Sequence, residues 1–232
     1  MWIFCCGMRR SGSTVQFQIT AKLVEEAGLG KSIDWVKPSK FAKLQKKYAA
    51  YDGWKVFKAH ICTDDMRAEF ERGNAKGVYI YRDLRDVFVS TMRKYSLPFD
   101  ELHESDFLDD CLRQYQNWNT LPGVLASRYE QMMADMAGEV ARIAAHLDIA
   151  IAPEESARIA ADFSIDKQKA RIEKATETGD LRKGIGNTHF APKTNLHTNH
   201  IHSGADGGWR EVLMQEQAAR IEATTGDWLA AH

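Results

Sequence analysis

The sequence lacks several features that would define whole classes of protein. No apolar run approaches the ~20 residues that a membrane span needs, and its start, MWIFCCGMRR, has neither the basic region nor the full apolar core of a secretory signal. With 31 Lys and Arg against 32 Asp and Glu, the formal net charge of −1 leaves no global field to hold nucleic acid or an anionic membrane. We therefore expect a cytoplasmic protein that binds a small molecule in a local pocket, without nucleic acid or membrane partners.

Cysteine is also scarce. The four cysteines are Cys5, Cys6, Cys62 and Cys111, and the adjacent pair Cys5 and Cys6 would point to opposite faces of a strand. Reduced thiols in the core explain them better than a disulfide or a metal site.

What the sequence does contain is an alternation of strand and helix patterns. Apolar runs predict strands over 2–6, 54–60, 77–81 and 123–129. Helical patterns follow them over 15–28, 64–72, 86–95 and 134–147. This alternation predicts an α/β, P-loop-like three-layer fold in which helices flank a central, mostly parallel sheet, with ligands beyond the carboxyl ends of the strands.

The rest of the chain extends this single domain, predicted over 1–232. Amphipathic patterns predict further helices over 153–174 and 209–228. Between them, 176–208 is rich in Gly, Asn, Thr and His and shows little periodicity, which predicts a flexible loop over cofactor and acceptor.

The first predicted strand runs directly into GMRRSGST, residues 7–14. The glycine spacing and final threonine match a phosphate-binding P-loop, except that Ser13 stands where a lysine is expected. Backbone N–H groups of such a loop, together with the start of the next helix, would hold a phosphate or sulfate. Arg9 and Arg10 could supply the missing positive charge. The alternative is an ordinary strand-to-helix turn with two solvated arginines.

The third predicted strand ends in YRDLRDVFVS, which offers a second anion site. Arg82 would lie at the carboxyl edge of the strand, and Ser90 about two helical turns further on. An arginine that can fork onto a phosphate and a hydroxyl that can donate to it suit a phosphate distant from the first. The alternative is a capped helix start in which Arg82 and Asp83 form a surface ion pair.

Together the two segments resemble the sulfotransferases that use 3'-phosphoadenosine 5'-phosphosulfate (PAPS), in particular a small soluble, bacterial-type member. The family's first loop reads like P-K-S-G-T-T-W and its second like R-N-P-x-D-x-x-x-S, a spacing that Arg82, Asp86 and Ser90 keep. In the family the first loop holds the 5'-phosphosulfate, and the arginine and serine hold the 3'-phosphate. The resemblance assigns these cofactor contacts to Arg10, Ser11, Gly12, Ser13, Thr14, Arg82 and Ser90, with Arg9 beside them.

Three further segments are similar to family motifs. WKVFKAH looks like the strand ending in K-T-H, in which the lysine steadies the transferring sulfuryl group and the histidine deprotonates the acceptor; the matching residues are Lys58 and His60. SRYEQM is similar to Y-E-D-M, whose tyrosine contacts adenine, which points to Tyr129. GADGGWREVLMQEQ resembles the segment around G-D-W that ends the cofactor-binding loop.

His60 alone would more simply be a buried histidine at a strand end, bonded to a backbone carbonyl. Lys58 changes this interpretation, because residues two apart on a strand share a face and both would project toward the phosphate loop. The ordinary pKa of a histidine also suits a base near neutral pH. We therefore expect in-line sulfuryl transfer with His60 as base and Lys58 as the catalytic cation, without a metal.

The sequence departs from the family at two places. Val15 stands where many members carry a tryptophan that stacks on adenine. His202, Ser203 and Gly204 stand where arginine, lysine and glycine normally complete the 3'-phosphate contact, and we assign them that place in the cofactor site. His200-x-His202 invites a metal, but no cysteine or acidic residue lies within three positions of His200 to complete a zinc spacing.

Two other functions stay open at this point. A P-loop kinase or NTPase would need a lysine after Gly12 and a strand-end aspartate for magnesium, a part that Asp83 could play. A non-catalytic nucleotide-binding protein on the same fold would suit the departures at Val15 and His202.

The expected acceptor is a hydroxyl or amine of a small molecule or carbohydrate. Its identity would depend on variable loops, which we place over 31–52, 96–119 and 176–208. Sugar, lipid, phenol and alkaloid are all compatible with the sequence.

Overall fold

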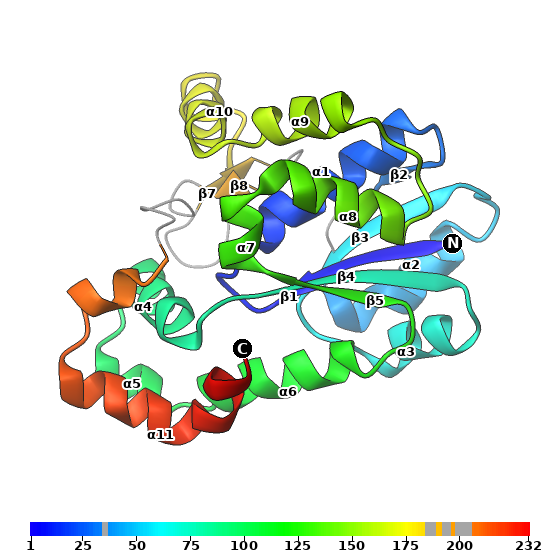
Figure 1. The fold of residues 1–232 in the computed structure, drawn as a ribbon. Helices are drawn as coiled ribbons and strands as arrows, with labels where there is room; N and C mark the ends of the chain where they lie inside the picture. The colour runs from blue at the N-terminus through cyan, green and yellow to red at the C-terminus, as the bar shows by residue number, and fades with distance from the viewer. Residues whose placement is uncertain (34–36, 184–188, 192–195, 198–205) are drawn as a thin grey trace.

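The computed structural model describes residues 1–33, 37–183, 189–191, 196–197 and 206–232. At its centre lies a five-stranded parallel sheet in the order β2-β3-β1-β4-β5 (Figure 1). The strands are β1 (Trp2–Gly7), β2 (Gly30–Ser32), β3 (Trp54–Ala59), β4 (Ala75–Tyr81) and β5 (Val124–Arg128). The predicted parallel sheet is confirmed, and the short edge strand β2 is an addition to it.

Helices cover both faces of the sheet (Figure 1). One face carries α1 (Ser13–Glu26) and α8 (Met136–His146), with α9 (Pro153–Asp162) packed against them. The other carries α2 (Phe41–Lys47), α3 (Asp64–Glu71) and α6 (Phe107–Asn119). The remaining elements are η1 (Pro38–Lys40), α4 (Leu84–Tyr95), α5 (Phe99–His103), α7 (Tyr129–Ala134), α10 (Ile165–Glu177), β6 (Arg182–Lys183), β7 (His189–Ala191), β8 (Leu196–His197), η2 (Gly208–Glu211) and α11 (Gln215–Ala231). None of the helices described here combines the length and apolar character of a membrane span.

The middle strand β1 is buried along its whole length because helices cover both of its faces. Phe4 and Cys6 belong to the core cluster shared with α2, α3 and α6, whereas Ile3 and Cys5 belong to the cluster shared with α1, α8 and α9. The two neighbouring cysteines therefore lie on opposite faces as free, buried thiols, as the sequence predicted.

The carboxyl ends of β1, β3 and β4 meet at one edge of the sheet. In register, β1 ends level with Ala59 of β3 and Ile80 of β4. The loop 8–12 follows β1, His60 follows β3, and Arg82 follows β4. Three of the predicted site segments therefore meet at the edge where parallel sheets bind ligands.

Capping residues divide the chain into more helices than the sequence patterns predict. The helix expected over 134–147 is α8, and the separate helix α7 precedes it. Asp135 lies between them and starts α8 by accepting a hydrogen bond from the Gly138 N–H (2.8 Å). The helix expected over 153–174 is broken into α9 and α10 at Ser164, whose hydroxyl caps α10. Short polar side chains favour such caps over helix interiors.

Two segments expected to be loops contain helices. Region 31–52 includes α2, and region 96–119 includes α5 and α6. Along α6, charged residues surround an apolar stripe that includes Leu108, Cys111 and Trp118, all of them buried. The described parts of 176–208 include the antiparallel strands β6, β7 and β8.

Candidate active site

The loop 8–12 joins β1 to α1, and its own contacts hold its shape. The Ser11 hydroxyl is fully buried; it donates to the carbonyl oxygen of Met8 (2.7 Å) and lies 3.1 Å from that of Ile80 in β4. Arg10 (φ 66°) and Gly12 (φ 85°) both adopt left-handed backbone conformations. Turns that mix left- and right-handed residues aim backbone N–H groups into a concavity that suits an anion. The Ser11 side chain therefore shapes the predicted phosphate loop.

Helix α1 begins directly after this loop, with Ser13 and Thr14 as its first residues. Among the described side chains, none caps its N-terminus, so its first N–H groups present the partial positive charge of the helix. Both first side chains are buried, and Thr14 Oγ1 accepts a hydrogen bond from Lys58 Nζ (2.7 Å). Lys58 thus projects from β3 toward the phosphate loop, as the sequence predicted.

Lys58 is a buried ammonium group among other cations. Burial is the main cause that lowers the pKa of Lys58 to about 7, and the charges of Lys94 and Arg10 act in the same direction. An anion bound nearby would favour the protonated form again.

His60 lies directly after β3 and is held as a neutral imidazole. Its Nδ1 lies 2.8 Å from the Gly7 carbonyl oxygen, and because a carbonyl only accepts, Nδ1 carries the hydrogen and Nε2 the lone pair. The indole N–H of Trp118 donates to the His60 carbonyl (3.2 Å) and fixes the backbone. Burial, followed by the positive charge of Lys58, lowers the pKa of His60 to about 3. Both interpretations of His60 are compatible with this geometry, since the bond to a backbone carbonyl leaves Nε2 able to accept a proton.

Arg10 crosses from the phosphate loop to α4, where its Nε donates to Ser90 Oγ (2.9 Å). Burial lowers the pKa of Arg10 to about 10, and Arg82 adds to the effect. Lys94 lies one helical turn beyond Ser90, and burial beside Arg10 and Arg9 lowers its pKa to about 8. Mutual repulsion of this kind marks a concentration of positive charge suited to a multiply charged anion.

Two further cations, Arg9 and Lys94, lie beside Arg10, and the sequence predicted one of them. Arg9 was predicted, and its side chain is half exposed, with Nη2 4.0 Å from Asp110 Oδ2. Lys94 was missed, although its spacing from Ser90 is the one that places two residues on the same face of a helix.

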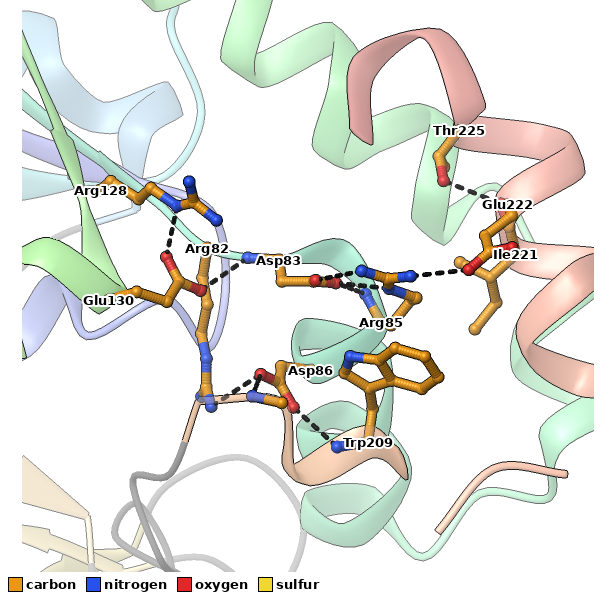
Figure 2. Close-up of polar contacts among 11 residues, drawn as sticks. Arg82, Asp83, Arg85, Asp86, Arg128, Glu130, Trp209, Ile221, Glu222 and Thr225 are labelled. Atoms are coloured by element: carbon orange, nitrogen blue, oxygen red, sulfur yellow. Dashed lines mark hydrogen bonds and ion pairs between the residues drawn. The ribbon is translucent and has the colours of Figure 1, made fainter. Parts of the chain in front are cut away.

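Arg82 turns inward, away from Asp83. It is 9% exposed, its guanidinium lies 4.4 Å from the centre of the Tyr129 ring, and Nη2 lies 3.4 Å from Asp86 Oδ2. Asp83 instead pairs with Arg85 (2.6 Å) and caps α4 by accepting from the Arg85 N–H (2.8 Å) (Figure 2). The alternative of a surface pair between Arg82 and Asp83 is therefore wrong.

Tyr129 packs between the two predicted anion sites. A Cβ at Gly12 would lie 2.7 and 2.9 Å from Cδ2 and Cε2 of the Tyr129 ring, so only glycine allows this approach. The ring also contacts Arg82, whose guanidinium lies over it. Val15 packs in the same small cluster as Tyr129 and Met132, where the family's tryptophan would stand. The predicted adenine contact thus lies between the phosphate loop and Arg82.

The predicted third contact to the 3'-phosphate, His202, Ser203 and Gly204, lies outside the described residues, as does His200 of the histidine pair.

One group of carboxylates among the described residues is close enough to share a cation. Ligand atoms of Asp86, Glu130 and Asp206 all lie within 4.8 Å of one another. Arg82 lies beside this group, so a positive charge already faces it.

These features define a class of protein: an α/β fold with a P-loop-like anion site at the carboxyl edge of a parallel sheet and a lysine and histidine pair beside it. Residues 2–231 match the sulfotransferase domain family, and the chain belongs to that family. The resemblance found in the five sequence segments is thereby confirmed.

Individual relatives are distant. The chain is 24% identical over 190 residues to cytosolic sulfotransferase 17 of Arabidopsis thaliana, an alignment that covers 74% of this chain and 54% of the relative. The chain thus spans about half the length of that curated relative.

Solved structures show the same fold. Mouse sulfotransferase SULT7A1 complexed with PAP has a TM-score of 0.72 at 18% identity, covering 97% of this chain and 82% of that one. Retinol dehydratase in complex with androsterone and the inactive cofactor PAP has a TM-score of 0.66 at 19% identity, covering 97% and 80%. The predicted P-loop-like architecture is confirmed by these likenesses.

Proposed function

We propose that the protein transfers the sulfuryl group of PAPS to a hydroxyl or amine of a small-molecule or carbohydrate acceptor. The observation that carries this proposal is the pair at the end of β3: Lys58 bonded to Thr14 of the phosphate loop, and His60 with Nδ1 on the Gly7 carbonyl and Nε2 left as a base. Family membership supports the same activity, and two structural relatives are described with PAP bound.

The hydrogen-bond donors and cations of the protein suit the two anionic ends of PAPS. The loop 8–12, the start of α1 and Lys58 would hold the 5'-phosphosulfate, while Arg82 and Ser90 would hold the 3'-phosphate. The Tyr129 ring, packed against Gly12 and Arg82, would form a wall for the adenosine between these two anion sites. When bound, PAPS supplies a sulfuryl group that is already activated by its link to phosphate.

Each residue of the pair has a separate task in this scheme. His60 Nε2 takes the proton of the acceptor, and the Gly7 carbonyl stabilises the N–H on the opposite side of the ring as it becomes positive. Lys58 and the N–H groups of the loop stabilise negative charge on the sulfuryl oxygens and on the 5'-phosphate oxygen, which leaves with PAP. The bound donor's negative charge also opposes the effect of Lys58 on His60, which raises the basicity of the imidazole.

The rival functions are less consistent with the site. A kinase of the P-loop type would use a lysine at position 13 and a strand-end aspartate free to bind magnesium. This chain has a serine at position 13, and its strand-end Asp83 is paired with Arg85. A protein that only binds nucleotide would not require His60 to present Nε2 beside Lys58.

Relatives suggest the kind of acceptor and location. One retinol dehydratase structure is described with retinol and another with androsterone, both small molecules that carry a hydroxyl. We propose a small acceptor for this chain as well, and a cytoplasmic location, because the curated relative is described as cytosolic.

Transfer can be tested without knowledge of the acceptor. The protein is incubated with sulfur-labelled PAPS and fractionated metabolite extracts, and each fraction is examined for labelled product together with stoichiometric PAP. Acceptor-dependent transfer is the expected result. Binding of PAP without transfer to any fraction would favour the non-catalytic alternative, and hydrolysis of ATP with magnesium in place of PAPS would favour the kinase.

A further inference from the structure

Asp86 joins two parts of the site that are far apart in the sequence (Figure 2). Its Oδ2 lies 3.4 Å from Arg82 Nη2 and accepts a hydrogen bond from the Gly207 N–H (2.9 Å), while its Oδ1 accepts from the Trp209 N–H (2.9 Å). The residue is 4% exposed, so these contacts are sheltered from water. One carboxylate therefore contacts both the arginine of the proposed 3'-phosphate site and the start of η2.

The η2 turn is also docked on α4 by contacts that do not involve Asp86. The centre of the Trp209 ring lies 4.1 Å from the guanidinium of Arg85, on α4, and 4.5 Å from that of Arg210. Arg85 is held in turn by Asp83 (2.6 Å) and by Glu222 of α11 (2.6 Å) (Figure 2). Loss of the Asp86 contacts should therefore loosen the turn without detaching it from the protein.

By charge alone, a carboxylate beside Arg82 is unfavourable for phosphate binding. Its removal should tighten the binding of any nearby anion, because like charges repel. A guanidinium, however, binds phosphate through a planar fork whose direction matters as much as its charge. The Arg82 guanidinium lies over the Tyr129 ring, and its Nη2 lies 3.4 Å from Asp86, so both contacts bear on its direction. Charge and direction thus predict opposite effects of the same substitution.

We propose that Asp86 is a positioning residue for recognition of the 3'-phosphate: it directs the Arg82 fork and makes that direction depend on the η2 turn at Gly207 and Trp209. The inference rests on the proposed function, since the 3'-phosphate belongs to the proposed donor. Asp86 should therefore affect binding of a nucleotide that carries this phosphate and leave binding of one without it unchanged.

The test compares adenosine 3',5'-bisphosphate with adenosine 5'-phosphate by calorimetry. Asp86→Asn should weaken the bisphosphate roughly tenfold, the size expected when a charge-assisted bond is misdirected, and leave the monophosphate unchanged. The matched control is Asp83→Asn, which removes a neighbouring negative charge and does not touch Arg82. It keeps a capping side chain on α4 and an oxygen that can accept from Arg85, which Glu222 also holds. This control should change both affinities by less than about twofold.

A second variant separates charge from geometry and covers a failure of Asp86→Asn to fold. Asp86→Glu keeps the negative charge but moves the carboxylate, so it should also weaken the bisphosphate selectively. Unchanged binding of the monophosphate shows in each case that the variant is folded. Hydrogen exchange of the peptide 206–213 tests the link to η2: the bisphosphate should slow it in the wild type, and this effect should be lost in Asp86→Asn.

The possible results separate the inference from the function on which it rests. A wild type that prefers the bisphosphate, with Asp86→Asn binding it equally well or more tightly, would overturn the positioning role and leave the proposed function intact. Equal binding of both nucleotides by the wild type would overturn the proposed 3'-phosphate site itself.

Discussion

Binding of adenosine 3',5'-bisphosphate should take up protons, because Lys58 has lost most of its charge above neutral pH in the free protein. Burial among Lys94 and Arg10 lowers the pKa of Lys58 to about 7. A phosphate bound in the loop beside Thr14 would place a negative charge next to these three cations. Opposite charges within a few ångströms shift a pKa by ~1–3 units, and a shift of ~2 units would give Lys58 a pKa of about 9 in the complex.

The size and sign of the effect follow from these two values. At pH 8 the ammonium form would make up roughly a tenth of the free protein and roughly nine tenths of the complex, an uptake of about 0.8 protons for each nucleotide bound. Because the complex binds more protons than the free protein, affinity should fall roughly 25-fold as the pH rises from about 7 to about 9, most of a total change of roughly a hundredfold. The nucleotide contributes little, since phosphates lose their second proton near pH ~6.

Calorimetric titrations at pH 8 in two buffers with different ionisation enthalpies count these protons directly. Lys58→Met should remove most of the uptake. Lys94→Met is the matched control: it removes a neighbouring cation whose own pKa is about 8 and should reduce the uptake without abolishing it. Uptake near zero in the wild type, or full uptake in Lys58→Met, would refute the placement of Lys58 at the bound phosphate.

Three further predictions concern the walls of the site. Gly12→Ala should abolish nucleotide binding in a thermal-shift assay, because its Cβ would enter the Tyr129 ring. Gly28→Ala is the control and should bind normally, since Gly28 is also left-handed but has no atom within 4 Å of the added Cβ. Arg82→Ala should weaken adenosine 3',5'-bisphosphate roughly ten- to a hundredfold in calorimetry and adenosine 5'-phosphate hardly at all; an equal loss for both would place Arg82 elsewhere. Tyr129→Ala should reduce affinity more than Val15→Ala, and the reverse order would place adenine against Val15.

The sequence predicted those parts of the molecule that depend on local pattern and spacing. β1 reads as a strand because both of its faces are apolar, and the loop after it follows from the positions of Gly7 and Gly12. Lys58 and His60 are two residues apart at a strand end, so their common direction needs no knowledge of the rest of the chain.

Features that depend on tertiary contacts could not be predicted in this way. The stacking of Arg82 on Tyr129 joins β4 to α7, and the bonds from Asp86 to Gly207 and Trp209 join residues more than a hundred positions apart. The motif spacing identified Asp86, but no local signal shows what its carboxylate contacts.

Burial also changes chemistry that the sequence can only take at its ordinary value. An exposed histidine has a pKa of ~6.5. Burial, with Lys58 beside the ring, lowers the pKa of His60 to about 3. The plot of kcat/KM against pH should therefore show no loss from His60 between about pH 5 and 7.

Whether His60 accepts the proton of the acceptor is decided by the turnover of His60→Ala with PAPS and the acceptor identified in the transfer assay. We expect kcat to fall roughly a hundred- to ten-thousandfold while the affinity for adenosine 3',5'-bisphosphate stays the same. His146→Ala is the control, because that ring also lies against a backbone carbonyl, of Gly77 (3.0 Å), but on the far helix α8, and it should turn over like the wild type. A His60→Ala protein with wild-type kcat would show that His60 is not the base.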